Sequence, residues 1–451
     1  MPPDHMSVTF LGTAAGRPST TRNVSSLVVK LDSKLWVFDA GEATQHQFMD
    51  ERCKLSMSRV ARIFITHMHA DHINGLPGLL CTISAGEGSV LPGHEDPRIG
   101  ESQGIPPTEI YGPSGLRLFL RTCLTLTHSI LTRPYVVHEL LFADEREELG
   151  DLHPSERPGR NIRADDEGYW RDFVRDAEGG GMSVSAGPIQ HTVRCLGFLL
   201  AESPRPLPIK PQRYIPHLKS PTNAAALAAQ GIKNPLSVLS RLQTSRDAVT
   251  LADGTVLHPP DLDPHGGRRV VILGDTYDAS AMIALVRALR PPADAADAGG
   301  DETDLVVHEA TNAYLPTLDD SQAPGKLRGG TPVTEEGVRA LAREHGHSTP
   351  RVAGAFARAV GARQLVLNHL SVKYPDPAAP GAQGASEESR GKWAAMLREI
   401  ERQARDELCG GGKGGGDEAR GEDGKGRVMT ACDFMEVEVV RRDKRRKAGA
   451  E

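Results

Sequence analysis

The sequence predicts a mixed α/β or α+β fold, and three observations lead to this class. Short runs rich in Val, Ile, Leu and Phe, typical of buried strands, recur along the chain. Between them lie longer segments in which apolar residues recur every three to four positions, as on one face of a helix. No internal repeat interrupts this alternation, and histidine or aspartate directly follows several of the predicted strands.

Composition sets the first limits on function. The chain has 451 residues, with 53 Lys and Arg against 59 Asp and Glu, so its formal net charge is −6. This balance excludes a uniformly basic nucleic-acid coat and leaves room only for a local basic patch. Hydrophobic residues make up 39% of the chain, enough for a sizeable core. No uninterrupted apolar run reaches the roughly 18 residues that a membrane span needs.

The six cysteines are scattered without a CxxC pair, so neither a disulfide framework nor a cysteine metal site is expected. The chain enters a predicted strand within its first ten residues and shows neither a signal peptide nor a transit peptide. We therefore expect a soluble protein of the cytoplasm, the nucleus or both.

In the first part of the chain, strands are expected at residues 7–11, 26–30, 35–38, 62–66 and 109–111. A helix is expected to start within 73–83, and a second helix covers 115–126 with leucines along one face. Residues 143–181 are acidic and rich in glycine, and we expect them to form a surface insertion.

The second part continues the alternation, with a helix over 279–290 and strands at 182–189, 197–202, 270–273, 304–308, 364–368 and 437–440. A further helix is expected after Ser348 or Thr349, either of which can cap it, with Pro350 in its first turn. Its buried stripe is expected at Val352, Ala355, Phe356 and Ala359, and Gly361 lies just beyond its end.

Four further segments have an irregular or biased composition. Residues 202–247 are rich in proline and weakly patterned, with seven Lys and Arg against two acidic residues, a local excess of five positive charges. Residues 375–392 and 409–427 have low complexity and are expected to be loops. Residues 441–451 form a basic tail, for which a nuclear localisation signal, a phosphate contact and no function at all remain open.

The strongest chemical signal is the segment 67–72, His-Met-His-Ala-Asp-His. Four metal-binding side chains within six residues cannot share one strand face or one helix stripe. A loop that leaves a buried strand can aim them at two adjacent points. His67 and His69 suit one ion, and Asp71 and His72 suit a second. The plain alternative is a histidine-rich surface loop without a ligand.

Three more candidates occupy matching places, because His191, Asp275 and His369 each follow a predicted strand. Any one of them alone would be an ordinary loop histidine or a helix-capping aspartate. Together with the 67–72 segment they make five histidines and two aspartates. This set is sufficient for two ions, with Asp275 shared between them.

The same stretches resemble tRNase Z (ribonuclease Z), specifically its short form, within the metallo-β-lactamase superfamily. The resemblance is carried by VTFLGTAAGRPSTTRN near the start, FDAGEATQ, FITHMHADHINGLPGLLCTIS, IYGPSGL, ILGDT, VHEAT, HGHSTPRVAGAFA and LVLNHLSVKY. VHEAT and GHST are the specific part, since other members of that superfamily share HxHxDH without this pair. The resemblance implies an αββα sandwich, the metallo-β-lactamase fold, as a single catalytic domain over 1–451 with an extruded flexible arm.

The resemblance also implies the roles of the site residues. His67, His69 and His191 would hold one zinc, Asp71, His72 and His369 the other, and Asp275 would bridge them. This gives two zinc ions per subunit, with manganese as the alternative metal. Asp71 would also accept the proton of the attacking water. His347 and Glu309 would form the general acid pair, against the alternative that they only join two loops by a hydrogen bond.

The inserted arm, residues 202–268, would hold tRNA away from the active site. Its candidate contacts are Lys210, Arg213, Lys219, Lys233 and Arg241. Positive charge on an irregular backbone suits phosphate contacts without base readout. The resemblance further implies a homodimer and no membrane partner.

These inferences give one leading function and two alternatives. The leading function is a zinc-dependent endoribonuclease that removes the 3′ trailer from precursor tRNA after the discriminator base. It would leave a 3′-hydroxyl on the tRNA and a 5′-phosphate on the trailer. The first alternative is a general metal-dependent phosphodiesterase of the same fold, acting on cyclic nucleotides or small diesters. The second is an RNA-binding or scaffold protein with an inactive site.

Overall fold

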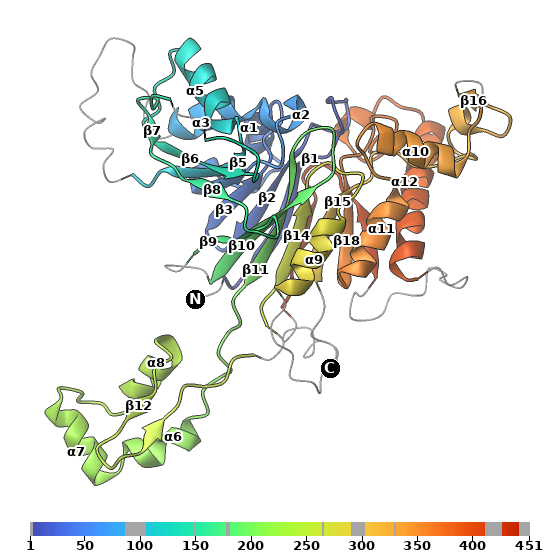
Figure 1. The fold of residues 1–451 in the computed structure, drawn as a ribbon. Helices are drawn as coiled ribbons and strands as arrows, with labels where there is room; N and C mark the ends of the chain where they lie inside the picture. The colour runs from blue at the N-terminus through green and yellow to red at the C-terminus, as the bar shows by residue number, and fades with distance from the viewer. Residues whose placement is uncertain are drawn as a thin grey trace.

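The computed structural model describes residues 3–85, 105–147, 150–176, 181–263, 266–289, 303–328, 331–410 and 426–441. Within them, two mixed β-sheets lie against each other and helices cover both outer faces (Figure 1). The predicted α/β class and the αββα layering are confirmed. No helix in these residues is both long and apolar enough to cross a bilayer.

The first sheet comes mostly from the N-terminal half of the chain. Its strands are β1 (Met6–Gly12), β2 (Ser26–Leu31), β3 (Lys34–Phe38), β4 (Val60–Phe64), β5 (Thr108–Pro113), β6 (Tyr135–Leu141), β7 (Glu156–Arg157), β8 (Asn161–Arg163) and β20 (Glu436–Glu438). They lie in the order β20-β1-β2-β3-β4-β5-β6-β7, with β8 also beside β6. Helices α1 (Thr44–Met49), α3 (Leu76–Ala85) and α5 (Leu116–Leu126) pack on its outer face.

The second sheet comes from the rest of the chain. It contains β9 (Trp170–Arg175), β10 (Met182–Ile189), β11 (Cys195–Glu202), β14 (Arg269–Leu273), β15 (Thr303–Glu309), β18 (Ala362–Asn368) and β19 (Arg427–Thr430). β14, β15, β18 and β19 run parallel to one another. Helices α9 (Ser280–Ala288), α11 (Pro350–Ala359) and α12 (Glu387–Leu408) cover its outer face.

The main core lies between the two sheets. Phe38 and Phe64 of the first sheet stack with ring centroids 4.7 Å apart, and Phe198 of the second sheet meets both rings edge-on at 5.6 Å. Aromatic packing of this kind adds specific geometry to a large buried apolar area. The sheets are thereby fixed face to face, which aligns the strand ends that carry the site.

A helical arm projects from the body between β11 and β14 (Figure 1). It contains α6 (Pro211–Leu218), α7 (Pro221–Ala229), α8 (Ser237–Thr244) and the two-stranded β12 (Val249–Thr250) and β13 (Val256–Leu257). Tyr214, Leu218, Leu227, Val238 and Leu242 belong to a small core of its own. The expectation of an irregular backbone here was wrong. Each helix is short and buries only one or two apolar residues, too few to show a helical period in the sequence.

The expected surface insertion over 143–181 was also wrong in part. Residues 170–175 form β9, which pairs with β10, and Trp170 and Phe173 enter the main core. This strand was not predicted because the residues on both sides of it are acidic and rich in glycine. Within the expected loop at 375–392, Ser386 caps α12, which begins at Glu387. Most of the low-complexity loop at 409–427 and of the basic tail at 441–451 lies outside the described residues.

The helix expected after Ser348 or Thr349 is α11, with Thr349 at its N-cap and Pro350 in its first turn. Its buried face differs from the expected one, because Ala353, Gly354 and Ala357 turn inward beside Phe356. Gly354 makes this packing close, since a Cβ atom there would lie 2.1 Å from the main-chain oxygen of Ala404 on α12. α12, which the sequence pattern did not reveal, therefore sets which face of α11 is buried.

Candidate metal centre

The predicted ligands come from loops at the ends of both sheets. The segment after β4 carries His67 and leads into the single turn of α2 (Ala70–Ile73), with His69 at the N-cap. His191 follows β10, Asp275 follows β14 by one residue, and His369 directly follows β18. Because the two sheets pack face to face, these strand ends meet, and the structure brings all seven predicted ligands together.

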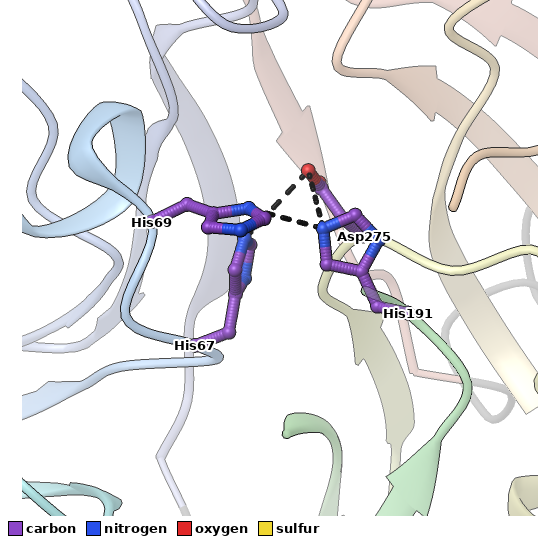
Figure 2. Close-up of side chains that lie close together, drawn as sticks. All are labelled: His67, His69, His191 and Asp275. Carbon is purple, nitrogen blue, oxygen red and sulfur yellow. Dashed lines mark hydrogen bonds and ion pairs between the residues drawn. The ribbon is translucent and has the colours of Figure 1, made fainter. Parts of the chain in front are cut away.

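Four of them form a first ligand set, shown in Figure 2: His67, His69, His191 and Asp275. Their ligand atoms all lie within 4.8 Å of one another. His191 Nε2 is 3.1 Å from His69 Nδ1, and His67 Nε2 is 3.7 Å from Asp275 Oδ2. Three imidazole nitrogens and one carboxylate at this spacing form a donor set typical of zinc.

A second set contains Asp71, His72, Asp275 and His369, again with ligand atoms within 4.8 Å. His369 Nε2 lies 3.1 Å from Asp71 Oδ2 and 3.3 Å from Asp275 Oδ2. His72 Nε2 lies 3.4 Å from Asp275 Oδ1. Asp275 belongs to both sets, as a residue shared by two ions would.

The state of these groups fits metal binding. His67 is fully buried, and its Nε2 has no hydrogen-bond partner among the described residues although it faces the cluster. Burial, together with His72, lowers the pKa of His67 well below its usual value, so the ring is neutral and offers a lone pair. Burial alone would raise the pKa of Asp275, but the imidazoles of His369 and His72 outweigh it and keep the carboxylate ionised. Neutral imidazole and ionised carboxylate are the forms that bind a divalent cation.

Surrounding groups fix the orientation of the ligands. Asp39 accepts hydrogen bonds from Thr66 N at 2.7 Å and Thr66 Oγ1 at 2.8 Å, and its Oδ2 lies 2.7 Å from His72 Nδ1. With Nδ1 bound to Asp39, His72 presents Nε2 to the site. The sequence pattern did not single out Asp39. This residue nevertheless directly follows an apolar strand, in the segment FDAGEATQ, just as several predicted ligands follow their strands.

His191 is held by the segment that precedes α11. Its Nδ1 donates to Gly346 O at 2.7 Å, which leaves Nε2 for the site. Gly346 has φ +84°, and a Cβ atom there would lie 2.5 Å from His191 Nδ1. Glycine is therefore required at this place in the GHST motif by both backbone conformation and space.

His347 and Glu309 form a pair beside the second ligand set. His347 Nδ1 lies 3.1 Å from Glu309 Oε1, which also accepts a hydrogen bond from Thr276 N at 2.6 Å. Burial lowers the pKa of His347, but Glu309, Asp275 and Asp71 outweigh it and raise the pKa to about 9. The side chain is 19% exposed, and Nδ1 is the nitrogen that faces Glu309.

The remaining candidates lie elsewhere. His308 is buried, with Nδ1 2.8 Å from Glu309 O, and packs on Phe356 outside both ligand sets. His345 is exposed at the end of α10 (Glu335–Glu344). The five predicted arm contacts are exposed on the arm and do not enter the metal centre: Lys210, Arg213, Lys219, Lys233 and Arg241.

Comparison with known proteins gives a consistent result. The chain is 36% identical over 386 residues to "Zinc phosphodiesterase ELAC protein 1" of Bos taurus, covering 82% of this chain and 87% of that protein. It is 30% identical over 375 residues to "Ribonuclease Z" of Streptococcus sanguinis (strain SK36), covering 82% and 90%. The crystal structure of human tRNase Z, short form (ELAC1), matches with a TM-score of 0.51 and 26% identity, covering 97% of this chain and 100% of that one.

A family model described as "Anti-Pycsar protein Apyc1" matches residues 6–85, which include the 67–72 segment but less than a fifth of the chain. The two facing sheets and the His/Asp cluster at their ends define a protein of the metallo-β-lactamase fold. Within that class, the chain belongs to the family of ribonuclease Z and zinc phosphodiesterase ELAC protein 1.

Proposed function

We propose that this protein is a zinc-dependent endoribonuclease that removes the 3′ trailer from precursor tRNA. It cuts after the discriminator base and leaves a 3′-hydroxyl on the tRNA and a 5′-phosphate on the trailer. The observation that carries this proposal is the meeting of two ligand sets through Asp275, with the His347–Glu309 pair directly beside them. The membership of the family supports it.

Two zinc ions fit the two ligand sets. One would be held by His67, His69 and His191, the other by Asp71, His72 and His369, and Asp275 would bind both. Zinc bound there supplies Lewis acidity, which stabilises the negative charge on the attacking and leaving oxygens of an in-line phosphodiester displacement. The donor set favours zinc, and manganese is the alternative metal.

The protein's own groups handle the protons. Asp71 Oδ2, which accepts a hydrogen bond from Gly16 N at 2.7 Å, takes the proton of the attacking water. The leaving ribose 3′-oxygen needs a proton, and His347 donates it from Nε2. Glu309, bound to His347 Nδ1 at 3.1 Å, keeps this imidazole protonated and correctly turned. Against the effect of burial, Glu309, Asp275 and Asp71 raise the pKa of His347 to about 9, so the ring carries this proton near neutral pH.

The arm supplies substrate specificity in this proposal. Its exposed lysines and arginines contact tRNA phosphates at a distance from the metal centre, which a small diester does not need. The protein acts as a homodimer in which the arm of one subunit presents tRNA to the site of the other. Its location in the cytoplasm, the nucleus or both remains a prediction from the sequence.

The test is to incubate the purified protein, with and without added zinc, with a 3′-extended precursor tRNA and to map the product ends. We expect a single zinc-dependent cut after the discriminator base that is lost in Asp71→Ala. An intact precursor, with zinc bound and bis-p-nitrophenyl phosphate still hydrolysed, would overturn the tRNA assignment and favour the general phosphodiesterase. Less than one zinc per chain after careful purification would instead favour an RNA-binding protein with an inactive site.

A further inference from the structure

Thr311 joins the two parts of the site that the proposed function treats separately. It lies two residues beyond Glu309, where the chain leaves β15. Its Oγ1 is 2.6 Å from Glu309 Oε2 and 3.1 Å from His369 Nδ1. One buried hydroxyl therefore touches both the carboxylate that binds His347 and the back of a metal-ligand imidazole.

The hydrogen atoms can be assigned along this path. His369 Nε2 faces Asp71 and Asp275 at 3.1 and 3.3 Å, so this nitrogen carries the lone pair for the ion. The proton of His369 then sits on Nδ1, which donates to Thr311 Oγ1. The Thr311 hydroxyl has a single hydrogen, and the nearer and charged acceptor within reach is Glu309 Oε2, since His369 O lies farther away at 2.9 Å.

Thr311 also contacts the main chain of His369, which is in an uncommon conformation. His369 has φ +52°, in the left-handed region that a histidine rarely occupies. Thr311 Oγ1 lies against both the ring and the carbonyl of this residue, and the main-chain N of Ser371 donates to Thr311 O at 3.2 Å. These contacts hold the turn that points the imidazole into the site.

We propose that Thr311 is a positioning residue that fixes both the tautomer of His369 and the orientation of Glu309. Its hydroxyl accepts from the imidazole and donates to the carboxylate, so the second ligand set and the His347–Glu309 pair share one hydrogen-bonded path. The proposal rests on the proposed function for the existence of the zinc site, but its first test does not depend on RNA cleavage.

That test compares the zinc affinity of Thr311→Val, which removes the hydroxyl and keeps the shape, with that of Thr311→Ser, which keeps the hydroxyl. Competition with a chromogenic zinc chelator measures the dissociation constant of the weaker zinc. We expect a loss of roughly 10–100-fold in Thr311→Val, the usual effect of removing a group that orients a ligand, and a loss below about threefold in Thr311→Ser.

Thr303→Val is the matched control, because it removes a buried threonine hydroxyl from the same chain segment, where that hydroxyl donates to Val360 O. It should bind zinc as the wild type does. Thermal melts of the zinc-free proteins check that each variant folds. If the methyl group that replaces the hydroxyl in Thr311→Val prevents folding, Thr311→Ala is used instead. Wild-type zinc affinity in the hydroxyl-free variant, or an equal loss in Thr311→Ser, would overturn the proposal.

A second measurement addresses Glu309. At saturating zinc, Thr311→Val should lower kcat for precursor tRNA by at least about tenfold more than kcat for bis-p-nitrophenyl phosphate. The nitrophenolate leaves without a proton, whereas the ribose 3′-oxygen depends on the acid pair. An equal effect on both substrates would overturn the link to Glu309. If the wild type binds zinc but does not cleave precursor tRNA, the proposed function fails while the zinc comparison still decides the role of Thr311.

Discussion

His347 differs from the histidines around it in what its two nitrogens contact. The five proposed ligand histidines each turn a nitrogen towards a shared carboxylate or another imidazole of the cluster. His347 Nδ1 lies nearest Glu309 Oε1, at 3.1 Å, and is 3.9 Å from Asp275, and its side chain is partly exposed. A protonated, partly accessible imidazole next to a metal cluster suits the protonation of a leaving group better than the binding of an ion.

This difference predicts that removing the His347 imidazole lowers kcat more for precursor tRNA than for a small diester. His347→Ala should lower kcat for precursor tRNA by about 10²–10⁴-fold, the usual contribution of a general acid. Hydrolysis of bis-p-nitrophenyl phosphate should fall by less than about tenfold, because its leaving group needs no proton. Steady-state kinetics on both substrates at saturating zinc measure the two losses. Glu309→Gln should show the same pattern more weakly, and an equal loss on both substrates would argue for a purely structural pair.

His138 provides a pH-dependent contribution to stability away from the metal centre. It lies on β6, stacks on Tyr111 at 4.6 Å and accepts a hydrogen bond from Arg160 N at 3.1 Å. Burial, with Arg160 nearby, lowers its pKa to about 4, so the folded protein binds the proton less well than the unfolded chain. The stability that this neutral ring contributes is complete above pH 6.5 and is lost as the pH falls towards 4.

We therefore expect the free energy of unfolding to fall more steeply with acid in the wild type than in His138→Gln, which keeps an acceptor for Arg160 N. Between about pH 7.5 and 4.5 the extra loss should be about 1–2 kcal/mol once solvent screening is allowed for. Urea unfolding at both pH values measures it, and other buried histidines cancel in the comparison. If the free energy of unfolding depends on pH equally in the two proteins, His138 does not titrate in this way.

At the residue scale, the sequence predicted the side chains that gather at the centre but not the groups that orient them. The 67–72 segment is contiguous, and His191, Asp275 and His369 each follow an apolar strand. Thr311 acts through a hydroxyl, and Gly16 through its main-chain N–H. Such groups occur throughout every chain, so only the tertiary contact distinguishes them.

At the level of elements, the arm is joined to the body at one narrow point. Glu202 N donates to Arg268 O at 2.9 Å, so the two ends of the arm lie side by side. The Arg268 guanidinium also donates to both Glu202 carboxylate oxygens, through Nε at 2.9 Å and Nη2 at 3.0 Å. Among the described residues, the arm has its own small core and the body has three others, so each part can be altered separately.

This geometry permits a clean excision of the arm. Replacing residues 205–265 by two glycines retains Glu202 and Arg268 and should leave bis-p-nitrophenyl phosphate hydrolysis within about threefold of the wild type. Precursor tRNA cleavage should lose about a hundredfold or more in kcat/KM, because several charged phosphate contacts are removed at once. Kinetics on both substrates measure the effect, and unchanged cleavage of precursor tRNA would make the arm an ordinary surface element.

A matched control keeps the arm and removes five of its positive charges. Five substitutions to alanine do this: Lys210→Ala, Arg213→Ala, Lys219→Ala, Lys233→Ala and Arg241→Ala. All five side chains are exposed, so the arm core should persist. Affinity for precursor tRNA should fall and depend less on salt concentration than in the wild type.

Elements with long apolar runs were predictable from the sequence, whereas short or amphipathic ones were not. β14 and β18 contain the uninterrupted apolar runs Val270–Leu273 and Leu365–Leu367, and such runs indicate buried strands. Half of the residues of α12 are charged, and it buries only a narrow stripe that includes Met396 and Ile400. Its first residues fell within the loop expected at 375–392, and the sequence pattern predicted no element for the rest. β9 is interrupted by Arg171 and Asp172, and only its pairing with β10 shows that it belongs to the sheet.

In the molecule as a whole, the candidate metal centre lies where the two sheets meet. His67, His69, Asp71 and His72 follow a strand of the first sheet, whereas His191, Asp275 and His369 follow strands of the second. At this contact the buried Nε2 of His67 has no hydrogen-bond partner among the described residues, which is costly unless an ion binds it. Bound zinc should therefore stabilise the packing of one half of the fold on the other, in addition to any role in catalysis.

Removal of zinc should accordingly lower the melting temperature by several degrees. A ligand that binds only the folded state at a thousandfold excess over its dissociation constant adds about 4 kcal/mol per site. Scanning calorimetry before and after chelation, with metal analysis on the same samples, measures the shift. Asp275→Ala removes the carboxylate that both ligand sets share, so chelation should change the melting temperature of this variant only slightly. His345→Ala, at an exposed position outside both sets, should show the same shift of melting temperature as the wild type. An unchanged melting temperature after complete zinc loss would mean that the three apolar cores alone hold the sheets together.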